Sequence, residues 1–267
     1  MNKQILFTTK LVSLAAMPSA FADLPGAILA DSPLAYYRFE EAPGATILAD
    51  SSGNGFDIDY ATPAGTTVLG EPAAIGSGAR FNRDGAIVTP LLLDPTVGDF
   101  TIEAVFRAEV DAADMVILAN RDGTFGPGRS NLVVNASRFF TTFSGGATTN
   151  SGVMVTEDGF DHVILTYDQS AAGGADPTFR FYINGEAAGT SSNIPEAANG
   201  NWVIGANKVL TTQFFNGLVD EIAIYDKRLD DLNGDGDLAD SAVGTHYKEY
   251  LADADTLVNF TSAVIYV

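Results

Sequence analysis

Hydrophobic and polar residues alternate with a period of two along most of this chain. In the segment Phe100 to Val110, every even-numbered residue is apolar, whereas the odd-numbered residues include Thr, two Glu and Arg. This alternation is typical of a half-buried strand in an antiparallel sheet. We therefore expect the polar face of this strand, which carries Glu103, to lie toward solvent.

Further segments with strand character follow one another through the chain, separated by Gly, Asn, Asp and Pro. The Asn184-Gly185 pair predicts a type I′ turn, because both central residues of that turn need positive φ. The segment 82–85, Asn-Arg-Asp-Gly, is a hairpin signal between two short strands. Turn signals at intervals of about 8–12 residues favour an all-β, two-sheet antiparallel β-sandwich.

One helix is predicted near the C-terminus, where Val243, Tyr247, Tyr250 and Leu251 share one face at helical spacing. Asp240 or Ser241 would cap it. Residues 253–267 are expected to form a tail or an added edge strand, and their final apolar run is too short to anchor the chain in a membrane.

The first 22 residues have the pattern of a signal peptide. Lys3 and Lys10 supply positive charge, the segment Leu11 to Met17 is apolar, and Ala20-Phe21-Ala22 has the small-x-small form of a cleavage site. We expect cleavage after Ala22 and a secreted or cell-surface protein. The alternative is an N-terminal core helix.

Composition narrows the possible functions. The 267 residues are 46% hydrophobic, enough for one large sandwich domain with its own core. The net charge of −20 disfavours nucleic acid and anionic membranes as partners. The acidic residues either keep the protein soluble outside the cell or include ligands for calcium. The absence of Cys excludes thiol chemistry.

Five segments in order resemble the laminin-G-like (concanavalin A-like lectin/glucanase) jelly-roll modules of bacterial extracellular proteins. They are LAYYRFEE with ADSSGNG, FTIEAVF, FDHVILTYD, FRFYINGEAAGT, and the segment 202–207 with FNGLVDEIAIYDKRL. The resemblance spans residues 24–251 and departs from the family at Asp161, where His is common. Together with the signal-peptide pattern, it divides the chain into a signal peptide at 1–22, a jelly-roll domain at 23–252 and a tail at 253–267. It also implies carbohydrate or protein partners and structural calcium.

The loop between the last strand and the helix resembles an EF-hand-like calcium loop. Its Asp and Asn residues occupy the first ligand positions, and Gly occupies the position of the sharp turn. It departs at position 12, where Ala stands in place of an acidic residue. The alternative is a solvated acidic loop. The predicted ligands are Asp231, Asn233, Asp235, Asp237 and Asp240.

A second calcium site is predicted around Asp220. Alternation in the last strand would place Asp220 on the core face with Ile222 and Ile224, where an unpaired carboxylate is costly. The resemblance implies that calcium can be held here, and Asp50 and Asn54 are the expected neighbours. The alternative is that Asp220 accepts hydrogen bonds from loop amides.

No catalytic pattern is found. Jelly-roll glucanases carry Glu-x-Asp-x-x-Glu or Glu-x-Asp-x-Glu on one strand, and neither string occurs. Glu103 stands alone on its strand. The two histidines, His162 and His246, are interpreted as packing or hydrogen-bonding residues. A lyase using Tyr, His and Arg has no supporting motif.

Carbohydrate binding is assigned to the Gly-rich loop 120–130 and to the single Trp, with a solvated loop and a packed Trp as alternatives. We thus predict a secreted non-catalytic carbohydrate-binding or adhesion module with calcium. The alternatives are a structural or protein-interaction module, with self-association through the tail, and a glycosidase or lyase. The predicted ligand-binding residues are Asn120, Arg121, Asp122, Phe125, Arg129 and Trp202.

Overall fold

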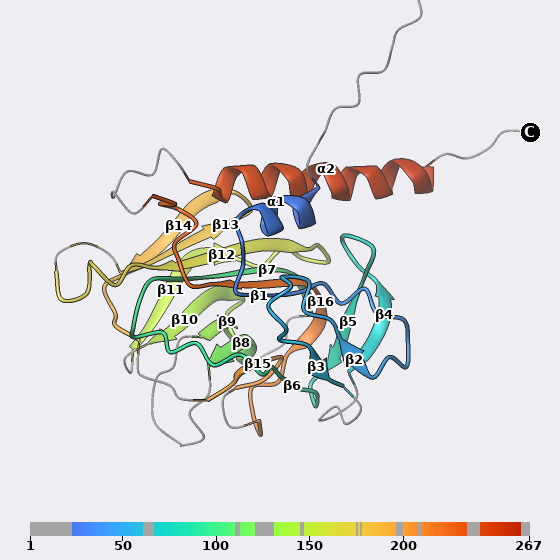
Figure 1. The fold of residues 1–267 in the computed structure, drawn as a ribbon, viewed down its shortest axis with the longest axis horizontal. Helices are drawn as coiled ribbons and strands as arrows, with labels where there is room; N and C mark the ends of the chain where they lie inside the picture. The colour runs from blue at the N-terminus through green and yellow to red at the C-terminus, as the bar shows by residue number, and fades with distance from the viewer. Residues whose placement is uncertain are drawn as a thin grey trace, which may run out of the picture.

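The computed structural model describes residues 23–60, 67–109, 113–120, 131–144, 147–174, 176, 178–195, 200–207, 210–233 and 241–262. Two antiparallel sheets are stacked face to face, and two helices lie against the outer face of one of them (Figure 1). The predicted all-β, two-sheet sandwich is therefore confirmed.

The first sheet contains eight described strands, with β16 near its centre. In spatial order they are β14 (Glu186–Ser191), β13 (Phe179–Ile183), β12 (Asp161–Tyr167), β7 (Phe100–Ala108), β16 (Asn216–Tyr225), β5 (Ser77–Asn82) and β4 (Val68–Pro72), with β1 (Ala35–Tyr37) also paired to β16.

The second sheet has six described strands. In order they are β11 (Ala147–Met154), β10 (Phe139–Ser144), β9 (Asn131–Val134), β8 (Met115–Asn120), β15 (Trp202–Ile204) and β6 (Ile87–Val88), and a small separate ladder joins β2 (Ile47–Leu48) to β3 (Ile58–Asp59).

The main core lies between the two sheets and is rich in aromatic rings. The predicted inward face of β7 is confirmed, because Phe100, Ile102, Ala104, Phe106 and Ala108 all belong to this core. Phe100 packs with Tyr167, Phe179 and Trp202 toward one end of the sandwich, and Phe106 packs with Phe140 and Phe215 toward the other. Each such ring contributes about 1.5–3 kcal/mol by leaving water.

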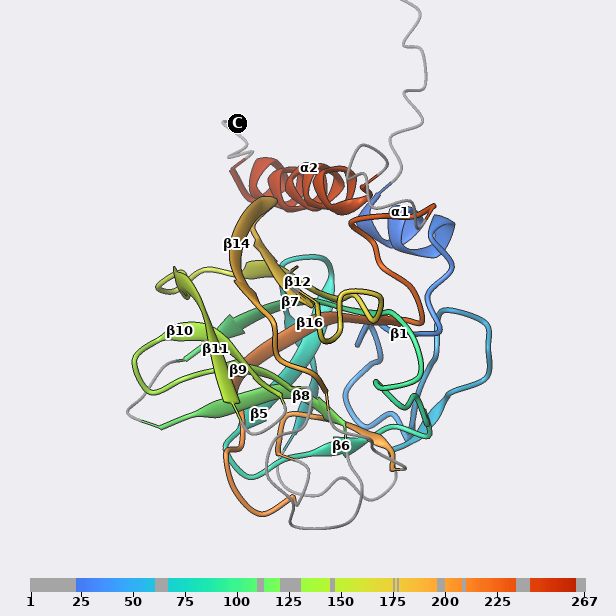
Figure 2. The ribbon, with the colours of Figure 1, turned by 90° about the vertical axis from the view of Figure 1, so that its left-hand side faces the viewer.

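The opposite face of the first sheet is also buried, which corrects the expectation that it meets solvent. Helices α1 (Leu24–Ala30) and α2 (Val243–Ser262) form a layer over it (Figure 2). Beneath them lies a second apolar cluster that includes Leu24, Tyr36, Val105 and Tyr250. Glu103 is consequently only 1% exposed. Strand alternation could not reveal this layer, because it is built by residues far away in the sequence.

Helix α1 was not predicted from the sequence. Asp23 caps it by accepting a hydrogen bond from the Gly26 amide, and Pro25 stands in its first turn. The Leu24 amide donates to Asp253 on α2 at 2.8 Å, and this bond joins the two helices. A helix of seven residues is marginal alone, so this packing supports it.

Helix α2 confirms the predicted helix but extends it. It runs to Ser262, so residues 253–262 are helical rather than an added edge strand. The final residues, 263–267, and the predicted signal peptide at 1–22 lie outside the described residues. Among the described helices, none is both long enough and apolar enough to span a membrane.

Two predicted turns had different outcomes. Asn184 and Gly185 have φ of 51° and 77°, as the predicted type I′ turn requires. The predicted hairpin around 82–85 is wrong, because β5 and β6, which flank it, belong to different sheets. The segment instead crosses from one sheet to the other, a connection that local turn residues cannot distinguish from a hairpin.

Candidate functional site

A small hollow lies at the rim of the sandwich, beside the connection that leaves β5, the segment before β8 and the segment before β16. We call it the rim pocket. Its volume is about 280 Å³, and it is lined by Arg83, Ala113, Asp114, Gln213 and Phe214. These residues come from three separate segments, so the pocket exists only in the folded chain.

Hydrogen bonds hold the walls of the rim pocket together. The Arg83 amide donates to the Phe215 carbonyl at 3.0 Å, and the Val116 amide donates to the Gln213 carbonyl at 2.9 Å. The Asp114 carboxylate accepts a bond from the Ala136 amide at 2.9 Å. The pocket is thus fixed to the ends of several strands.

The side chains of the rim pocket combine different chemistry in a small space. Arg83 supplies guanidinium donors, Asp114 supplies carboxylate acceptors, and the Gln213 carboxamide can do both. Phe214 adds an aromatic ring and packs against the apolar cluster of Ala86 and Val203. This set suits a small ligand with hydroxyl groups and one apolar face.

A second hollow of about 320 Å³ lies between the 43–46 loop and the start of β4. Its described lining residues carry no charge: Pro43, Gly44, Ala45, Thr46, Tyr60, Thr67, Val68 and Leu69. With fewer convergent polar groups, it is less suited to recognising a polar ligand.

Glu103 on β7 is the centre of a buried polar cluster. Its carboxylate lies 2.7 Å from Nε2 of His162, and both its oxygens lie 3.0 Å from Nδ1 of His246. The Tyr225 hydroxyl donates to it at 2.7 Å. Burial acts to raise the pKa of Glu103, but the attraction of His246 and the hydrogen bonds of both histidines hold it well below its usual range.

The side chains of the Glu103 cluster are shielded from solvent by the described residues around them. The side chains of Glu103, His162 and His246 are each 1% exposed, and none of them lines either of the two hollows. Both histidines form buried hydrogen bonds, as the sequence predicts. The cluster joins three strands of the first sheet to α2.

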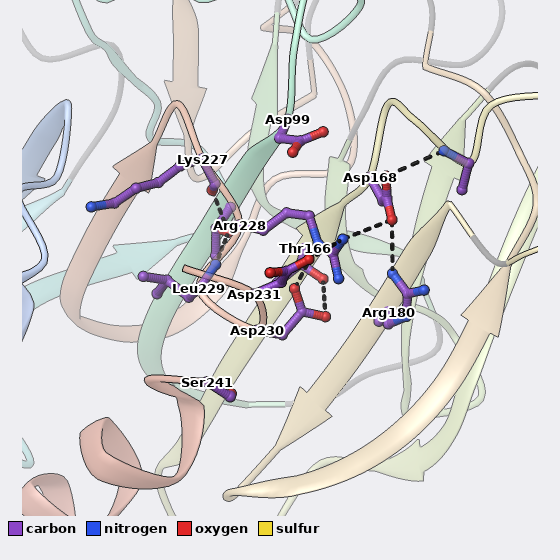
Figure 3. A network of polar contacts seen from close by, with 12 residues as sticks. Asp99, Thr166, Asp168, Arg180, Lys227, Arg228, Leu229, Asp230, Asp231 and Ser241 are labelled. Carbon is purple, nitrogen blue, oxygen red and sulfur yellow. Dashed lines mark hydrogen bonds and ion pairs between the residues drawn. The ribbon is translucent and has the colours of Figure 1, made fainter. Parts of the chain in front are cut away.

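A second buried network surrounds Arg228 in the connection after β16 (Figure 3). Its guanidinium lies 2.9 Å from Asp230, 2.7 Å from Asp168 and 3.2 Å from Asp231. Burial acts to raise the pKa of Asp168, but hydrogen bonding by Ser170 and the charge of Arg228 hold this pKa below its usual value. The network fixes the start of the connection to α2.

The predicted calcium loop is only partly described. Asp231, its first predicted ligand, is buried, and one of its carboxylate oxygens accepts a hydrogen bond from Arg228 at 3.2 Å. Asn233 is exposed. Asp235, Asp237 and Asp240 lie outside the described residues, so calcium in this loop stays a prediction.

Asp50 and Asn54 do not gather with Asp220. One Asp50 oxygen accepts bonds from the amides of Tyr36 and Ser52, and the other from the Ser52 hydroxyl and the Phe56 amide. The Asn54 amide group donates to the Leu34 carbonyl at 3.0 Å. These side chains stabilise their own turn against β1, which leaves little room for a metal on Asp50.

Asp220 does not lie on the core face. A β-bulge in β16 follows Val219, which pairs with Phe106, while Glu221 pairs with the next residue, Val105. The extra residue shifts the alternation, so the side chain of Asp220 accepts from the Ile75 amide at 2.7 Å. This contact corresponds to the alternative, in which loop amides satisfy Asp220.

Glu221, the neighbour of Asp220, is also buried. Arg38 lies 3.5 Å away and partly compensates it. Burial is the main cause that raises the pKa values of Asp220 and Glu221 well above their ordinary ones, and the two carboxyl groups also repel each other.

The predicted ligands of the second calcium site are each bonded within their own surroundings. One oxygen of Asp220 is buried without a hydrogen-bond partner, which would suit a cation. However, across the part of the chain that the structure describes, no three His, Cys, Asp or Glu side chains converge to hold a metal ion. Calcium at Asp220 therefore stays a prediction.

Two predicted ligand-binding residues are fully buried, so the prediction is wrong for them. Trp202 and Asn120 are both 0% exposed. The indole of Trp202 donates to the Leu93 carbonyl at 3.0 Å, and its ring packs against Phe100. Both residues belong to paired strands of the second sheet. The loop residues Arg121, Asp122, Phe125 and Arg129 lie outside the described residues.

The residues of the rim pocket were missed because no local pattern marks them. Arg83 stands in the segment that looked like a hairpin, and Asp114 comes more than 30 residues later. Gln213 and Phe214 precede the last strand. Their proximity depends on the order of strands in the two sheets, which the sequence pattern does not specify.

Fold and topology define a lectin- or glucanase-type β-sandwich with an added helical layer. The sequence profile of the concanavalin A-like lectin/glucanases superfamily, in its laminin-G form, matches residues 81–232. The match covers more than half of the chain, so the protein belongs to this family. No curated protein matches the sequence significantly.

Solved structures with the same fold share little sequence with this chain. Trypanosoma rangeli sialidase in complex with sialic acid is 14% identical with a TM-score of 0.57. That match covers 85% of this chain but 33% of the sialidase, so the chain spans about one third of its length. Domain 4 of AbnA, a GH43 extracellular arabinanase from Geobacillus stearothermophilus in complex with arabinotriose, is 18% identical with a TM-score of 0.55. Here 81% of this chain and 98% of that domain are covered.

Proposed function

We propose that this protein is an exported, non-catalytic carbohydrate-binding module and that the rim pocket binds the sugar. The observation that carries the proposal is the chemistry of that pocket. A sugar ring offers an apolar C–H face, which suits the ring of Phe214. Its hydroxyl groups donate and accept, which suits Arg83, Asp114 and Gln213.

The fold supports the same class of ligand. The arabinanase domain that this chain resembles over 98% of that domain's length was solved with arabinotriose. A neutral oligosaccharide also suits a protein with a net charge of −20, which repels polyanions at long range. Export is proposed from the signal-peptide pattern of residues 1–22.

A binding role fits the placement of the carboxylates better than hydrolysis does. A glycosidase needs two carboxylates beside the bond that is cleaved. The described lining of the rim pocket includes one, Asp114. Glu103 and Glu221 are buried beneath the helical layer, at 1% and 0% exposure.

The proposal is tested by a glycan array, followed by calorimetry with arabinotriose or whichever oligosaccharide the array selects. In Phe214→Leu the apolar packing is kept and the ring is lost, so affinity should fall roughly three- to tenfold. Gln213→Ala should weaken binding by about fivefold through lost hydrogen bonds.

Thr46→Ala, in the second hollow, is the matched control and should bind like the unmodified protein. If Phe214→Leu binds as well as the unmodified protein while Thr46→Ala binds less, the site lies in the second hollow instead. No binding to any glycan on the array would contradict the carbohydrate proposal itself.

One observation favours a structural or protein-interaction function as the alternative. Leu92 and Val97, in the connection between β6 and β7, are 66% and 70% exposed. Contiguous exposed apolar side chains mark protein contacts, and these two stand five residues apart in one connection. A silent glycan array together with self-association in analytical ultracentrifugation would favour this function.

A further inference from the structure

The helical layer is attached to the first sheet through a charged side chain that has carboxylates on both sides. Nδ1 of His246 lies 3.0 Å from both oxygens of Glu103, and Nε2 lies 2.9 Å from an oxygen of Asp31. Ionised carboxylates only accept hydrogen bonds. Both ring nitrogens must therefore carry a proton, which makes His246 an imidazolium ion.

Glu103 is held in its ionised form by its other neighbours. The Tyr225 hydroxyl donates to it, and Nε2 of His162 lies 2.7 Å from it. A carboxyl group that accepts several hydrogen bonds favours the charged state. Because Glu103 and His246 are each about 1% exposed, water cannot replace either partner.

The groups around this ion pair come from every element packed against it. The ring of His162 stacks on Tyr247 and Tyr250, which belong to α2. The negative charge of Glu103 acts to raise the pKa of Tyr36. No other His exists in the chain. The titratable groups are Glu103 on β7, His162 on β12, Tyr225 on β16, Tyr36 on β1, Asp31 after α1, and Tyr247 and Tyr250 on α2.

A separate apolar cluster fills the contact between the helical layer and the first sheet. The cluster of Leu24, Ile28, Tyr225, Val243 and Tyr250 is separate from the core between the sheets. Helices α1 and α2 lie together on the same side of the sandwich (Figures 1 and 2). They are joined to each other by the hydrogen bond between the Leu24 amide and Asp253. Segments with separate cores can open as units while the rest of the domain stays folded.

We infer that His246 is a protonation-dependent latch, and that loss of its proton releases the α1–α2 layer from the first sheet while the sandwich stays folded. Deprotonation would leave the carboxylates of Glu103 and Asp31 facing a ring that can donate to only one of them. Glu103 would then be a buried anion with less compensation, and the opening of the layer would hydrate it.

The direction of the titration follows from the same contacts. Burial acts to lower the pKa of His246. The attraction of Glu103 and the hydrogen bonds to Asp31 and Glu103 outweigh burial and raise this pKa to about 10. The latch is therefore closed at neutral pH and opens in alkali. It does not involve the rim pocket, so glycan binding and latch opening can be measured independently.

The experiment follows two reporters during alkaline titration. Hydrogen exchange of α2, corrected for the intrinsic rate, reports the layer, and the fluorescence of Trp202 reports the core between the sheets. We expect exchange of α2 to accelerate before the emission of Trp202 changes. Simultaneous changes in both reporters would overturn the latch, because the layer would not open alone.

Asp31→Asn tests the mechanism with little risk to folding, because the side chain of Asp31 is 22% exposed. Removing one carboxylate should lower the pH midpoint of α2 opening by about 1–3 units. Glu186→Gln, an exposed change of equal charge on β14, should leave the midpoint unchanged. An Asp31→Asn midpoint equal to that of the unmodified protein would overturn the proposal.

The charge state is tested directly on the unmodified protein. In ¹⁵N-labelled protein at pH 7.5, both ring nitrogens of His246 should show the chemical shifts of protonated nitrogen. A neutral His246 ring at this pH would overturn the inference whatever the variants do.

Discussion

Single residues of this chain matter most where a close approach between elements leaves no room for a side chain. Gly185 has positive φ in the turn after β13, and the ring of Tyr247 on α2 packs directly on it. A Cβ atom there would lie 2.3 Å from that ring. One glycine therefore serves both the turn and the docking of the helical layer.

Gly185→Ala should destabilise the protein by more than the backbone strain of positive φ, which costs about 1–2 kcal/mol. The clash with Tyr247 should add about 1–3 kcal/mol. Urea denaturation measures the total. The control is Gly44→Ala, where φ is 86° and no atom lies within 4 Å of the added Cβ. Equal losses in the two variants would show that Tyr247 yields without cost.

Among the elements, β16 connects most of the features described above. It follows Phe214 of the rim pocket, contains the bulge at Asp220 and ends shortly before Arg228. The bulge occurs where the pairing partner of β16 changes from β5 to β1. An added residue at this junction turns two neighbouring carboxylates away from the main core.

Calcium in the connection from β16 to α2 is tested with a chelator. If the loop binds calcium, removal of the metal should lower the melting temperature by about 5–10 °C. Asp235→Ala should abolish this shift. Asp231→Ala is a poor test, because it also removes a partner of Arg228. Asp176→Ala, at an exposed position, is the control and should keep the shift.

A melting temperature that does not respond to the chelator in the unmodified protein would contradict the calcium prediction. If Asp235→Ala retains the full shift, calcium binds elsewhere in the protein.

At the scale of the whole molecule, the described residues form three layers, and the contact between the helical layer and the first sheet contains most of the buried charges discussed above. His246, Glu103, Asp220 and Glu221 all lie between the helical layer and the first sheet or at its border. The interior between the two sheets is mainly apolar. The response of the protein to pH should therefore arise chiefly from the helical side.

Stability should fall as the pH rises from about 6.5 to about 10. The folded-state pKa of His246, about 10, lies above its ordinary value of 6.5, so its contribution is complete below pH 6.5 and is lost as the pH passes 10. One pKa unit corresponds to about 1.4 kcal/mol, so a loss of a few kcal/mol is expected. Asp220 and Glu221 act in the same direction, because their pKa values are also raised.

Urea denaturation at a series of pH values measures this trend, and His246→Gln should flatten it. A free energy of unfolding that is constant or rises between pH 7 and 10 would contradict the assignment of His246. On the acid side, the low pKa of Glu103 keeps its contribution until the pH falls below about 4.5.

Sequence alone determined the sandwich, most of its strands and one helix, because these depend on local periodicity. The inward residues of β7 follow from alternation, and the turn at Asn184 follows from the need for positive φ. Both are properties of a few consecutive residues, which any reader of the chain can recognise.

Only the tertiary structure decided which polar residues meet, because those meetings join segments far apart in the chain. Alternation predicted that Glu103 faces solvent, but two helices cover it in the folded chain. Alternation also predicted that Asp220 faces the core, but a β-bulge shifts its register. Trp202 is buried in the core between the sheets, and the rim pocket lies where three connections converge. Periodicity specifies which face a side chain takes within one element, whereas a site depends on how elements pack against one another.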